Sequence, residues 1–355
     1  MRACDVLIIG AGPGGSAAAI TAALAGLRVL VLERLRFPRH RPGETLPPGA
    51  EPLFRQLGVW EAIERAGFIR HPGQRVAWAG DAKFSRFGGT AEEPWLGFQA
   101  WRSVLDAALL QRAVSLGVEV WQPCRAVSPM FAGARVCGVV TDRGEVRARH
   151  VVDAAGGGGW LARKLGEPAE QHSPRLLASY GYVETERAAD WGIPELQSVA
   201  GGWIWMAQVQ PRIVAWTRLS LDGRRGDAPR QLAELRDAHP LRLGGTSADV
   251  TWRLAPRSAG PGYFLVGDAA LVLDPASSHG VLRALMSGIM AGDRLAQICR
   301  DRVPEELATA EYSRWIRAWF AHDSKKLAGF YGEIADLPAW LAPNREEPEW
   351  AETSA

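Results

Sequence analysis

The sequence predicts an α/β fold that begins with a dinucleotide-binding unit, and three features near its start predict it. An apolar run, Cys4–Ile9, leads directly into the pattern Gly-x-Gly-x-x-Gly at residues 10–15. An alanine-rich helical stretch follows, and a second apolar run, Val29–Leu32, ends at the acidic residue Glu33. Strand, tight turn, helix, strand and acid in this order form the context that a bare glycine pattern lacks, so we expect a dinucleotide to bind here.

The turn between the first strand and the first helix supplies the phosphate-binding surface. Its glycines permit the tight turn, let a pyrophosphate approach the backbone, and let helix and strand pack closely. The helix start adds free N–H groups and the positive end of the helix dipole. The acid after the second strand is placed to accept hydrogen bonds from ribose hydroxyls. A glycine-rich turn in an ordinary α/β protein is the competing interpretation. The residues expected to contact the dinucleotide here are Gly10, Gly12, Pro13, Gly14, Gly15 and Glu33.

Composition indicates a soluble globular protein. The 355 residues are 47% apolar and 23% charged with a net charge of +2, which gives no sign of attraction to nucleic acid or to a membrane surface. The four cysteines are widely spaced and form no Cys-x-x-Cys pair, so we expect neither a disulfide framework nor a metal site. The first residues do not resemble a signal peptide, and no apolar run is long enough to span a bilayer. A cytoplasmic protein is therefore expected.

A basic, proline-rich loop follows Glu33. Arg34 and Arg41 in this loop are placed to neutralise a pyrophosphate or to meet an incoming phosphorylated cofactor, and a solvated basic loop is the alternative. Glu44, further along, is a candidate for binding substrate or for holding the loop. An amphipathic helix is predicted next, over residues 51–67, because its apolar residues recur at helical spacing.

The pattern of the chain changes twice after this helix, which predicts an inserted second unit. In residues 75–97 the apolar residues alternate as in a β-ribbon, and residues 175–251 contain several further strand-like runs. We expect these two segments to form a β-sheet substrate domain. The remaining segments 1–74, 98–174 and 252–331 are expected to form the discontinuous dinucleotide-binding domain, and residues 332–355 an acidic tail.

Two later segments indicate that ligand contacts continue far down the chain. One buried strand ends at Asp153 and is followed by small residues up to Gly156. Another ends at Val266 and is followed by Gly267 and Asp268. Glycines at such points let a ligand approach the backbone closely. An elongated dinucleotide would require contacts this far from the first turn.

These features together resemble the FAD-dependent enzymes of the para-hydroxybenzoate-hydroxylase-like superfamily, which includes aromatic monooxygenases, flavin-dependent halogenases and geranylgeranyl reductases. The resemblance rests on the glycine turn with Glu33, on Arg102, on residues 153–156 and on residues 267–280, in the family's order and spacing. It implies an FAD-binding Rossmann-like domain of the glutathione-reductase type with an inserted β-sheet substrate domain.

The same resemblance assigns positions along the FAD. Arg102 would meet the pyrophosphate, the backbone at Ala126 the adenine, and Asp268 the ribityl chain. The loop 274–280 and the helix that begins at Val281 would face the isoalloxazine ring, where a helix N-terminus stabilises the negative charge of reduced flavin. Beyond the glycine turn, the expected FAD contacts are Arg34, Arg41, Arg102, Ala126, Gly156, Gly267, Asp268, Pro275, Gly280 and Val281.

Two short motifs narrow the resemblance. Residues 43–48 and 277–282 are similar to segments of the flavoproteins that hydroxylate protein tryptophans during maturation of quinone-cofactor enzymes. This implies an FAD-dependent monooxygenase that uses O2, through a flavin hydroperoxide, to hydroxylate a tryptophan or indole group, including one carried by a partner protein. Trp78, Trp203 and Trp205 are candidates to line the substrate site, with core packing as the alternative.

Departures from the halogenase pattern favour hydroxylation. Flavin-dependent halogenases carry a Trp-x-Trp-x-Ile-Pro signature and an active-site lysine. Here Trp203 and Trp205 are followed by Ala207 and Gln208 where the signature has Ile-Pro. Lys83 is the lysine in a plausible substrate-facing segment, and no motif surrounds it. Without a positioned amine, halogenation loses its mechanism.

His279 and Glu44 are the candidate catalytic residues. His279 lies beside the expected flavin, where a histidine can act as an acid or a base, and each residue alternatively orders its loop by hydrogen bonding. Electrons are expected from transiently docked NADH or NADPH or from a separate flavin reductase, because the sequence has no second glycine-rich nucleotide fold. A flavin-dependent halogenase, a geranylgeranyl-reductase-like flavin reductase and a non-catalytic flavin-binding partner protein are the alternative functions.

Overall fold

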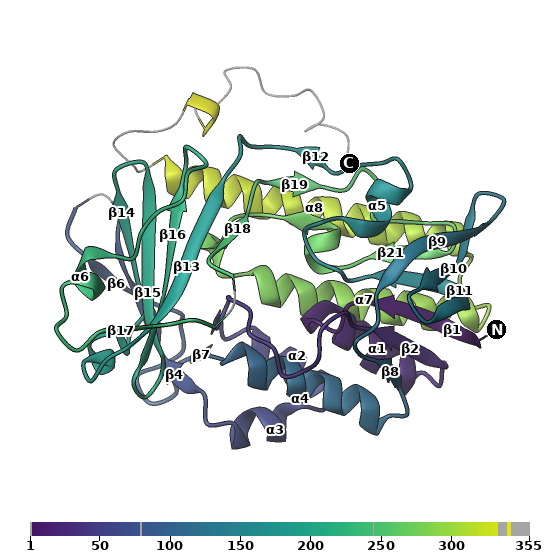
Figure 1. The fold of residues 1–355 in the computed structure, drawn as a ribbon, viewed down its shortest axis with the longest axis horizontal. Helices are drawn as coiled ribbons and strands as arrows, with labels where there is room; N and C mark the ends of the chain where they lie inside the picture. The colour runs from purple at the N-terminus through teal and green to yellow at the C-terminus, as the bar shows by residue number, and fades with distance from the viewer. Residues whose placement is uncertain (1, 79, 244, 333–338, 342–355) are drawn as a thin grey trace.

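The computed structural model describes residues 2–78, 80–243, 245–332 and 339–341, which form two large β-sheets, two small ones and the helices packed on them (Figure 1). One large sheet carries the predicted dinucleotide-binding unit, and the other lies at the opposite end of the molecule. The long helix α8 (Glu305–Tyr331) runs from the second sheet along the first. The α/β class expected from the sequence is confirmed.

The first sheet is largely parallel and grows out of the apolar runs of the sequence. β1 (Arg2–Ile9) pairs in parallel with β2 (Val29–Leu32) on one side and with β11 (Gly144–Asp153) on the other. The side chains of Val6–Ile9 and of β2 are buried, as is typical of parallel strands covered on both faces. The other strands of this sheet are β8 (Glu119–Trp121), β9 (Ala126–Ala132), β10 (Arg135–Thr141), β20 (Ala259–Gly260) and β21 (Tyr263–Leu265).

Two helices that begin at candidate ligand contacts pack against each other. α1 (Pro13–Leu24) follows the glycine turn and lies along α7 (Gly280–Cys299). Small residues make this close contact possible, since a Cβ added to Gly288 would lie only 2.2 Å from the Gly14 carbonyl oxygen. The start of α7 is thereby held beside the glycine turn. The remaining α-helices are α2 (Ala50–Gln56), α3 (Trp60–Arg65), α4 (Arg102–Ser115), α5 (Trp160–Lys164) and α6 (Arg230–Ala233).

The second sheet contains strands from both segments that the sequence assigns to a substrate domain. Its order is β17-β13-β16-β15-β14-β5-β6, with β18 beside β13. The early β-ribbon, β5 and β6, joins the later strands because β5 pairs in parallel with β14. The domain boundaries themselves stay a prediction. The strands are β5 (Gly73–Ala77), β6 (Lys83–Arg86), β13 (Leu177–Glu184), β14 (Glu195–Val199), β15 (Gly202–Gln210), β16 (Ile213–Ser220), β17 (His239–Leu241) and β18 (Ser247–Asp249).

The two faces of the second sheet have different partners. Ile204 and Met206 of β15 pack in a local cluster with Trp191. Alternate residues of a strand point to opposite faces, so Trp203 and Trp205 lie on the other face, where they pack with the main core that includes the first sheet. We call this the inner face of the second sheet.

A small sheet connects the two large ones. β7 (Gly97–Gln99) pairs antiparallel with β3 (Thr45–Leu46) and with β4 (Ile69–His71). Both β4 and β7 also contact β15. The chain therefore passes from the first sheet to the second through this small sheet. A further small sheet contains β12 (Glu170–Gln171), β19 (Arg253–Leu254) and β22 (Leu271–Val272).

The prediction of one helix over residues 51–67 is wrong, because the structure has two, α2 and α3. Gly58 adopts φ +67°, a left-handed conformation that ends the first of them. The apolar residues of both helices continue nearly the same spacing, so periodicity alone does not reveal the break.

In the part of the chain that the structure describes, no helix is long and apolar enough to cross a membrane. The same residues contain no group of histidine, cysteine, aspartate and glutamate side chains that could hold a metal ion. The predicted acidic tail, residues 332–355, lies outside the described residues except for 332 and 339–341.

Candidate functional site

The fold itself requires two glycines of the first turn and leaves little room at a third. Gly10 adopts φ +101°, and a Cβ there would lie 2.4 Å from the carbonyl oxygen of Ala154. A Cβ on Gly15 would lie 1.9 Å from the Gly10 carbonyl oxygen, and one on Gly14 would lie 3.1 Å from that of Ala284. A side chain on Gly10 or Gly15 would have to displace backbone atoms. The tight strand–turn–helix geometry therefore depends on glycine at these two positions.

Gly12 differs, because the fold does not explain its missing side chain. Its φ of −70° suits any residue. A Cβ there would come no closer than 3.6 Å to its nearest described neighbour, Arg39 Nη2. Gly12 is the N-cap of α1, no side chain caps this helix start, and Pro13 follows it. The first N–H groups of the helix therefore lack a side-chain acceptor, and the bare Cα of Gly12 lets a phosphate approach them.

Glu33 is buried at the end of β2 and holds the turn. Its carboxylate oxygens accept hydrogen bonds from the N–H groups of Ala11, at 3.0 Å, and Leu35, at 2.9 Å. Each oxygen keeps a further lone pair for another donor. Glu33 thus presents a fixed carboxylate beside the turn, where a ribose hydroxyl would need it.

A cluster of ionised side chains lies next to the turn. Arg34 and Arg41, the arginines that the sequence singled out, are exposed. Arg39 from the same loop is instead largely buried, and it donates to Asp106 at 3.0 Å. Arg102 makes two further hydrogen bonds to this carboxylate, at 2.9 and 3.0 Å. Two guanidinium groups around one carboxylate leave net positive charge beside the glycine turn, which suits a pyrophosphate.

Sequence reasoning missed Arg39 and Asp106. The loop contains several arginines of similar appearance, and nothing local distinguishes the one that turns inward. Asp106 lies one helical turn after Arg102, a spacing that places the two side chains on one face of α4. That spacing is the signal that could have identified Asp106.

Asp153 shapes the loop after β11. It is fully buried, and its two oxygens accept from the N–H groups of Ala155, at 2.9 Å, and Leu161, at 2.8 Å. Burial raises the pKa of Asp153, and these two hydrogen bonds only partly offset the rise. The loop so held presents Gly156, which adopts φ +90° with open space where a side chain would lie.

Gly267 and Asp268 form a turn beside this loop. Gly267 adopts φ +57° and donates its N–H to Ser287 Oγ at 2.9 Å. Asp268 is exposed. Its Cβ lies 3.9 Å from a Cβ built on Gly157, so the two later glycine segments lie side by side. Asp268 is thereby presented to the same space as the loop after β11.

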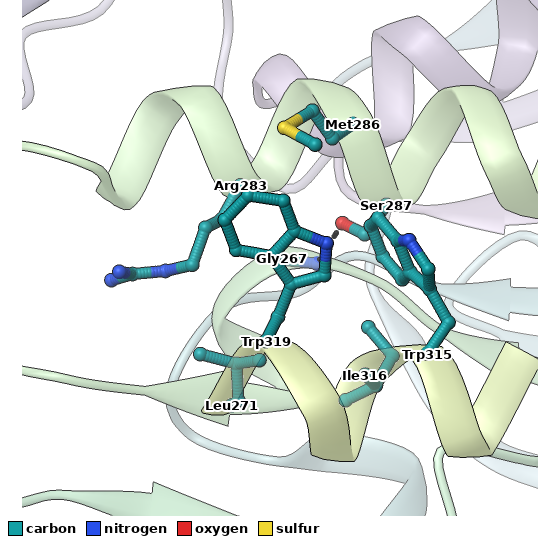
Figure 2. A pocket seen from close by; sticks show the side chains of 8 residues that line it. All are labelled: Gly267, Leu271, Arg283, Met286, Ser287, Trp315, Ile316 and Trp319. Atoms are coloured by element: carbon teal, nitrogen blue, oxygen red, sulfur yellow. Dashed lines mark hydrogen bonds between the residues drawn. The ribbon is translucent and has the colours of Figure 1, made fainter. Parts of the chain in front are cut away.

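A small cavity lies beside Gly267, between α7 and α8 (Figure 2). Met286 and Ser287 of α7 face Trp315 and Trp319 of α8 across it. Its volume is about 10 Å³, roughly the space of one water molecule. The cavity is too small for an aromatic substrate, so these tryptophans pack the two helices together.

The segment before α7 is built around a buried acid. Asp274 caps the short 3-10 helix η3 (Pro275–Ser277), and its Oδ2 accepts from Trp252 Nε1 at 2.7 Å. Ser278 then adopts φ +53°. At Gly280, the exposed first residue of α7, a Cβ would meet no atom of the described chain within 4 Å apart from its own neighbours. Like the N-cap glycine of α1, Gly280 lacks a side chain for no reason internal to the fold.

His279 precedes α7 and lies beside a charged pair. Its Nδ1 is 3.5 Å from Asp323 Oδ2, and Arg283 donates to the same oxygen at 2.6 Å. Burial alone would raise the pKa of Asp323, but the neighbouring His279 and Arg283 side chains lower it below its ordinary value. Asp323 therefore stays ionised beside the imidazole, whose Nδ1 makes no hydrogen bond to the residues that the structure describes. It comes from α8, far along the chain, and no sequence pattern links it to His279.

Glu44 is buried and bonded to the second sheet. Its Oε1 accepts from the hydroxyl of Tyr182 on β13 at 2.6 Å, and its Oε2 accepts from the Gly43 N–H at 2.9 Å. Burial raises the pKa of Glu44. The hydrogen bond from Tyr182 and the charge of Arg102 lower it, but they offset the effect of burial only in part. Since the protein engages both oxygens, the geometry favours the loop-holding role that the sequence left open for Glu44.

The three candidate substrate tryptophans differ in exposure. Trp203 is 1% exposed and donates its indole N–H to the hydroxyl of Tyr331 at 2.7 Å. Trp78 is 5% exposed and stacks on Phe330 with 3.9 Å between ring centroids. Both pack between the second sheet and the end of α8, as the core-packing alternative expects. Trp205 is only partly buried on the inner face, so it is the member of the set best placed to meet a ligand.

Ala126 and Val281 are the residues expected at the two ends of the FAD, the adenine and the isoalloxazine. Ala126 is the first residue of β9 and is partly buried. Val281 is buried near the loop before β3, since a Cβ on Gly43 would lie 3.9 Å from Val281 Cγ2. The loop that carries Glu44 therefore touches the start of α7.

These residues fit FAD. Gly12 and Gly280 begin two helices that contact each other, and neither glycine is explained by packing. The chain would hold the ribose at Glu33, the pyrophosphate at Gly12 with the arginine cluster, the ribityl chain at Asp268 and the isoalloxazine at Gly280.

Comparisons with known proteins agree with this fit. Residues 3–218 match the model of a family described as FAD binding domain. The tryptophan 2-halogenase of Chondromyces crocatus is 28% identical over 92% of this chain and 67% of its own length. The menaquinone reductase of Mycobacterium tuberculosis is 30% identical over 87% of this chain and 81% of its own.

Solved structures give the same result. The myxobacterial chondrochloren halogenase, described as a variant of FAD-dependent halogenases, superposes with a TM-score of 0.84 at 26% identity and covers 95% of this chain and 84% of its own. The family match spans more than half of the chain and coincides with the glycine turn and the β11 loop. The chain therefore belongs to the FAD-binding-domain family, as an FAD-dependent oxidoreductase of the superfamily of aromatic monooxygenases and halogenases.

Proposed function

We propose that this oxidoreductase is a monooxygenase that hydroxylates an indole-type aromatic group. The observation that carries the proposal is the position of its lysines. The chain has four, and all are exposed: Lys83, Lys164, Lys325 and Lys326. By the family resemblance, a halogenase needs an active-site lysine to capture or direct hypohalous acid. Hydroxylation requires no such group, so the lysine positions support it.

The residues of the chain have defined tasks in this reaction. FAD, when bound, supplies the chemistry with O2, and the protein binds the substrate, excludes water and moves protons. The N-terminus of α7 offers positive potential to the isoalloxazine. His279 is placed beside it for proton transfer, with the Asp323 carboxylate 3.5 Å from its Nδ1. Trp205 offers an aromatic surface from the opposite side.

We further propose that the aromatic group is presented by a protein. One relative, at 27% identity over 83% of this chain and 78% of its own length, is named 1H-pyrrole-2-carbonyl-[peptidyl-carrier protein] brominase and comes from Pseudoalteromonas luteoviolacea. Its name describes an aromatic ring carried on a protein. The similarity of residues 43–48 and 277–282 to protein-tryptophan hydroxylases supports the same form of substrate.

Halogenation is the second candidate function. Trp203 and Trp205 retain both tryptophans of the halogenase signature, and the tryptophan 2-halogenase is similar over most of the chain. A reductase is the third, because of the 30% identity to menaquinone reductase.

One set of reactions separates these functions. The FAD-loaded enzyme is given isotope-labelled O2 with free tryptophan, indole or tryptophan-bearing proteins, with and without bromide or chloride. NADH, NADPH and a separate flavin reductase are tried as electron sources. We expect one labelled oxygen atom in the product whether or not halide is present, and faster reaction with a protein substrate. A halogenated product alone would show a halogenase. Reoxidation of the reduced enzyme by a naphthoquinone without O2 would show a reductase, and turnover of small indoles alone would overturn the protein-substrate proposal.

A further inference from the structure

The small sheet β3-β7-β4 has one polar face. Its pairing places Thr45, Gln99 and Ile69 in one cross-strand row, and Gly97 and His71 in a second row. Directly opposed residues share a face, and so do residues two apart in a strand. Thr45, Gln99 and His71 therefore lie on the same face. The hydrogen bond from Thr45 Oγ1 to Gln99 Oε1, at 2.8 Å, agrees with this arrangement.

The opposite face of the small sheet carries Phe98 and Arg70 and is filled. Phe98 packs edge-to-face on Phe54 of α2 and on Trp60 of α3, with ring centroids 5.8 and 6.2 Å apart. Since these helices occupy that face, the polar face is turned away from them. β15, which carries Trp205, contacts both β4 and β7, so we place the polar face toward the inner face of the second sheet.

Three buried nitrogen atoms in this region have no hydrogen-bond partner among the described residues. They are His71 Nε2, Gln99 Nε2 and Trp205 Nε1. His71 and Gln99 are both 0% exposed. An unsatisfied buried polar atom destabilises the fold, and such atoms are uncommon in folded proteins. Several of them on facing elements indicate a place where a ligand supplies the missing partners.

The chemistry of each nitrogen follows from its other contacts. His71 Nδ1 lies 2.8 Å from the Gly73 carbonyl oxygen, which can only accept, so the proton is on Nδ1. Burial lowers the pKa of His71 despite the nearby carbonyls of Gly73 and Phe98, so the ring is neutral and Nε2 is an acceptor. The Gln99 oxygen already accepts from Thr45, which leaves its N–H groups as donors.

The position of this polar face relative to the flavin is set by the loop before β3. Gly43, two residues before Thr45, lies against Val281 at the start of α7. The polar face thus begins beside the helix start that would meet the isoalloxazine. Phe87 adds an aromatic wall, with its ring centroid 5.4 Å from that of His71. An aromatic molecule bound here would lie between the flavin end of the FAD site and β15.

We propose that His71 and Gln99 are substrate-recognition residues, with His71 Nε2 accepting the ring N–H or O–H of a neutral indole- or phenol-type aromatic group and Gln99 Nε2 donating to an acceptor beside it. This inference deepens the proposed function and rests on it for the reaction, because the reaction of the bound aromatic group is the one proposed above. It does not rest on it for binding, which needs neither electrons nor oxygen. His71 and Gln99 form hydrogen bonds to polar groups at the edge of the aromatic ring, while Phe87 and Trp205 contact its faces.

Binding of two probes to the oxidised holoenzyme tests the proposal. Indole has a ring N–H, 1-methylindole lacks it, and perturbation of the flavin absorbance reports both. We expect indole to bind at least about tenfold more tightly. In His71→Asn the side chain still reaches Gly73 but no longer offers the acceptor, so this preference should disappear. In His71→Gln an oxygen reaches the former Nε2 position, and the preference should remain within about threefold of wild type. Equal binding of the probes to wild type, no binding of either, or an unchanged preference in His71→Asn would overturn the proposal.

A measurement on the wild-type holoenzyme needs no variant to fold. With isotope-labelled histidine, the imidazole nitrogens of His71 should show the neutral ring with its proton on Nδ1 at neutral pH, and indole should shift the Nε2 resonance. A cationic ring, a proton on Nε2, or no shift with saturating indole would overturn the assignment. Neither experiment measures turnover. Failure of oxygen insertion would therefore count against the proposed function and leave this inference intact, and the reverse also holds.

Discussion

The starts of α1 and α7 offer a ligand the same backbone donors, but the protein fixes them to different degrees. At α1, a Cβ added to Gly10 or Gly15 would lie only 2.4 or 1.9 Å from a backbone carbonyl oxygen, and the first turn is buried. At α7, Gly280 is exposed with open space around it, and His279 lies beside Asp323, a side chain from another helix, at 3.5 Å. The end of the site that would hold the adenosine is thus determined by the fold. The end that would hold the isoalloxazine depends on contacts between distant parts of the chain and the ligand.

The largest effect is expected where the fold fixes the turn. In Gly15→Ala the new methyl group would lie 1.9 Å from the Gly10 carbonyl oxygen. Backbone would have to move, so we expect the free energy of unfolding to fall by more than about 3 kcal/mol, with loss of FAD from any protein that folds. Chemical denaturation and flavin content measure both. Wild-type stability in this variant would show that the turn is as loosely packed as the start of α7.

The second effect concerns how the start of α8 is held against the first sheet. Burial alone would raise the pKa of Glu305, but hydrogen bonds from His150, Arg135 and the Gly262 N–H lower it to about 2. Because this pKa is lowered, the ionised Glu305 stabilises the fold at pH values above the ordinary pKa of a glutamate. This stabilisation is lost as the pH falls toward 2. After allowance for partial exposure, we expect the charged form to contribute about 2 kcal/mol.

The role of Glu305 is tested by comparing the free energy of unfolding of wild type with that of Glu305→Gln. Between about pH 5 and pH 2, wild type should lose its advantage over Glu305→Gln, measured as free energy of unfolding by denaturant at each pH. FAD binding at neutral pH should change little, because Glu305 begins α8 beside Ile298, near the end of α7 that is far from Gly280. A pH-independent difference would mean that Glu305 acts through packing rather than charge.

The third effect isolates ligand contact from folding. In Gly12→Ala and Gly280→Ala the added methyl group would meet no described atom closer than 3.6 Å and 4 Å, respectively. Without FAD, both variants should unfold within about 0.5 kcal/mol of wild type. FAD affinity should fall by about tenfold or more in Gly12→Ala, because the methyl group would occupy the path of the pyrophosphate. Gly280→Ala should instead perturb the flavin spectrum and its reduction. Unchanged FAD binding in Gly12→Ala would remove the main support for the phosphate position.

The same contrast explains what could be predicted from the sequence. β1, α1 and β2 carry their signals within themselves, as apolar runs, a glycine pattern and a terminal acid, and they form where expected. The long helices α7 and α8 also follow from patterns within their own sequences. β14 was not predicted, because its sequence lacks a strong alternation and it forms by pairing with β5 and β15.

The candidate site was predictable only in part for the same reason. His279 was identified from its place beside a motif, but its partner Asp323 lies on α8. Arg39 was indistinguishable from its neighbours until the loop folded. His71 and Gln99 gave no sequence signal, since their importance comes from hydrogen bonds that the fold leaves unmade. Local sequence specifies elements, whereas these partnerships are set by tertiary packing.

The smallest effect is expected at Lys83, and it tests the chemistry at the less constrained end. Lys83 lies on β6 at the edge of the second sheet and is exposed. If the enzyme hydroxylates, Lys83→Met should keep stability and oxygen insertion within about twofold of wild type, because an exposed side chain away from packed features contributes little. The matched control is Lys164→Met, which removes an exposed lysine from α5. A loss of turnover in Lys83→Met alone, by about a hundredfold or more, is what removal of a catalytic amine produces. That result would place a reactive lysine at the substrate and shift the proposed reaction from hydroxylation to halogenation.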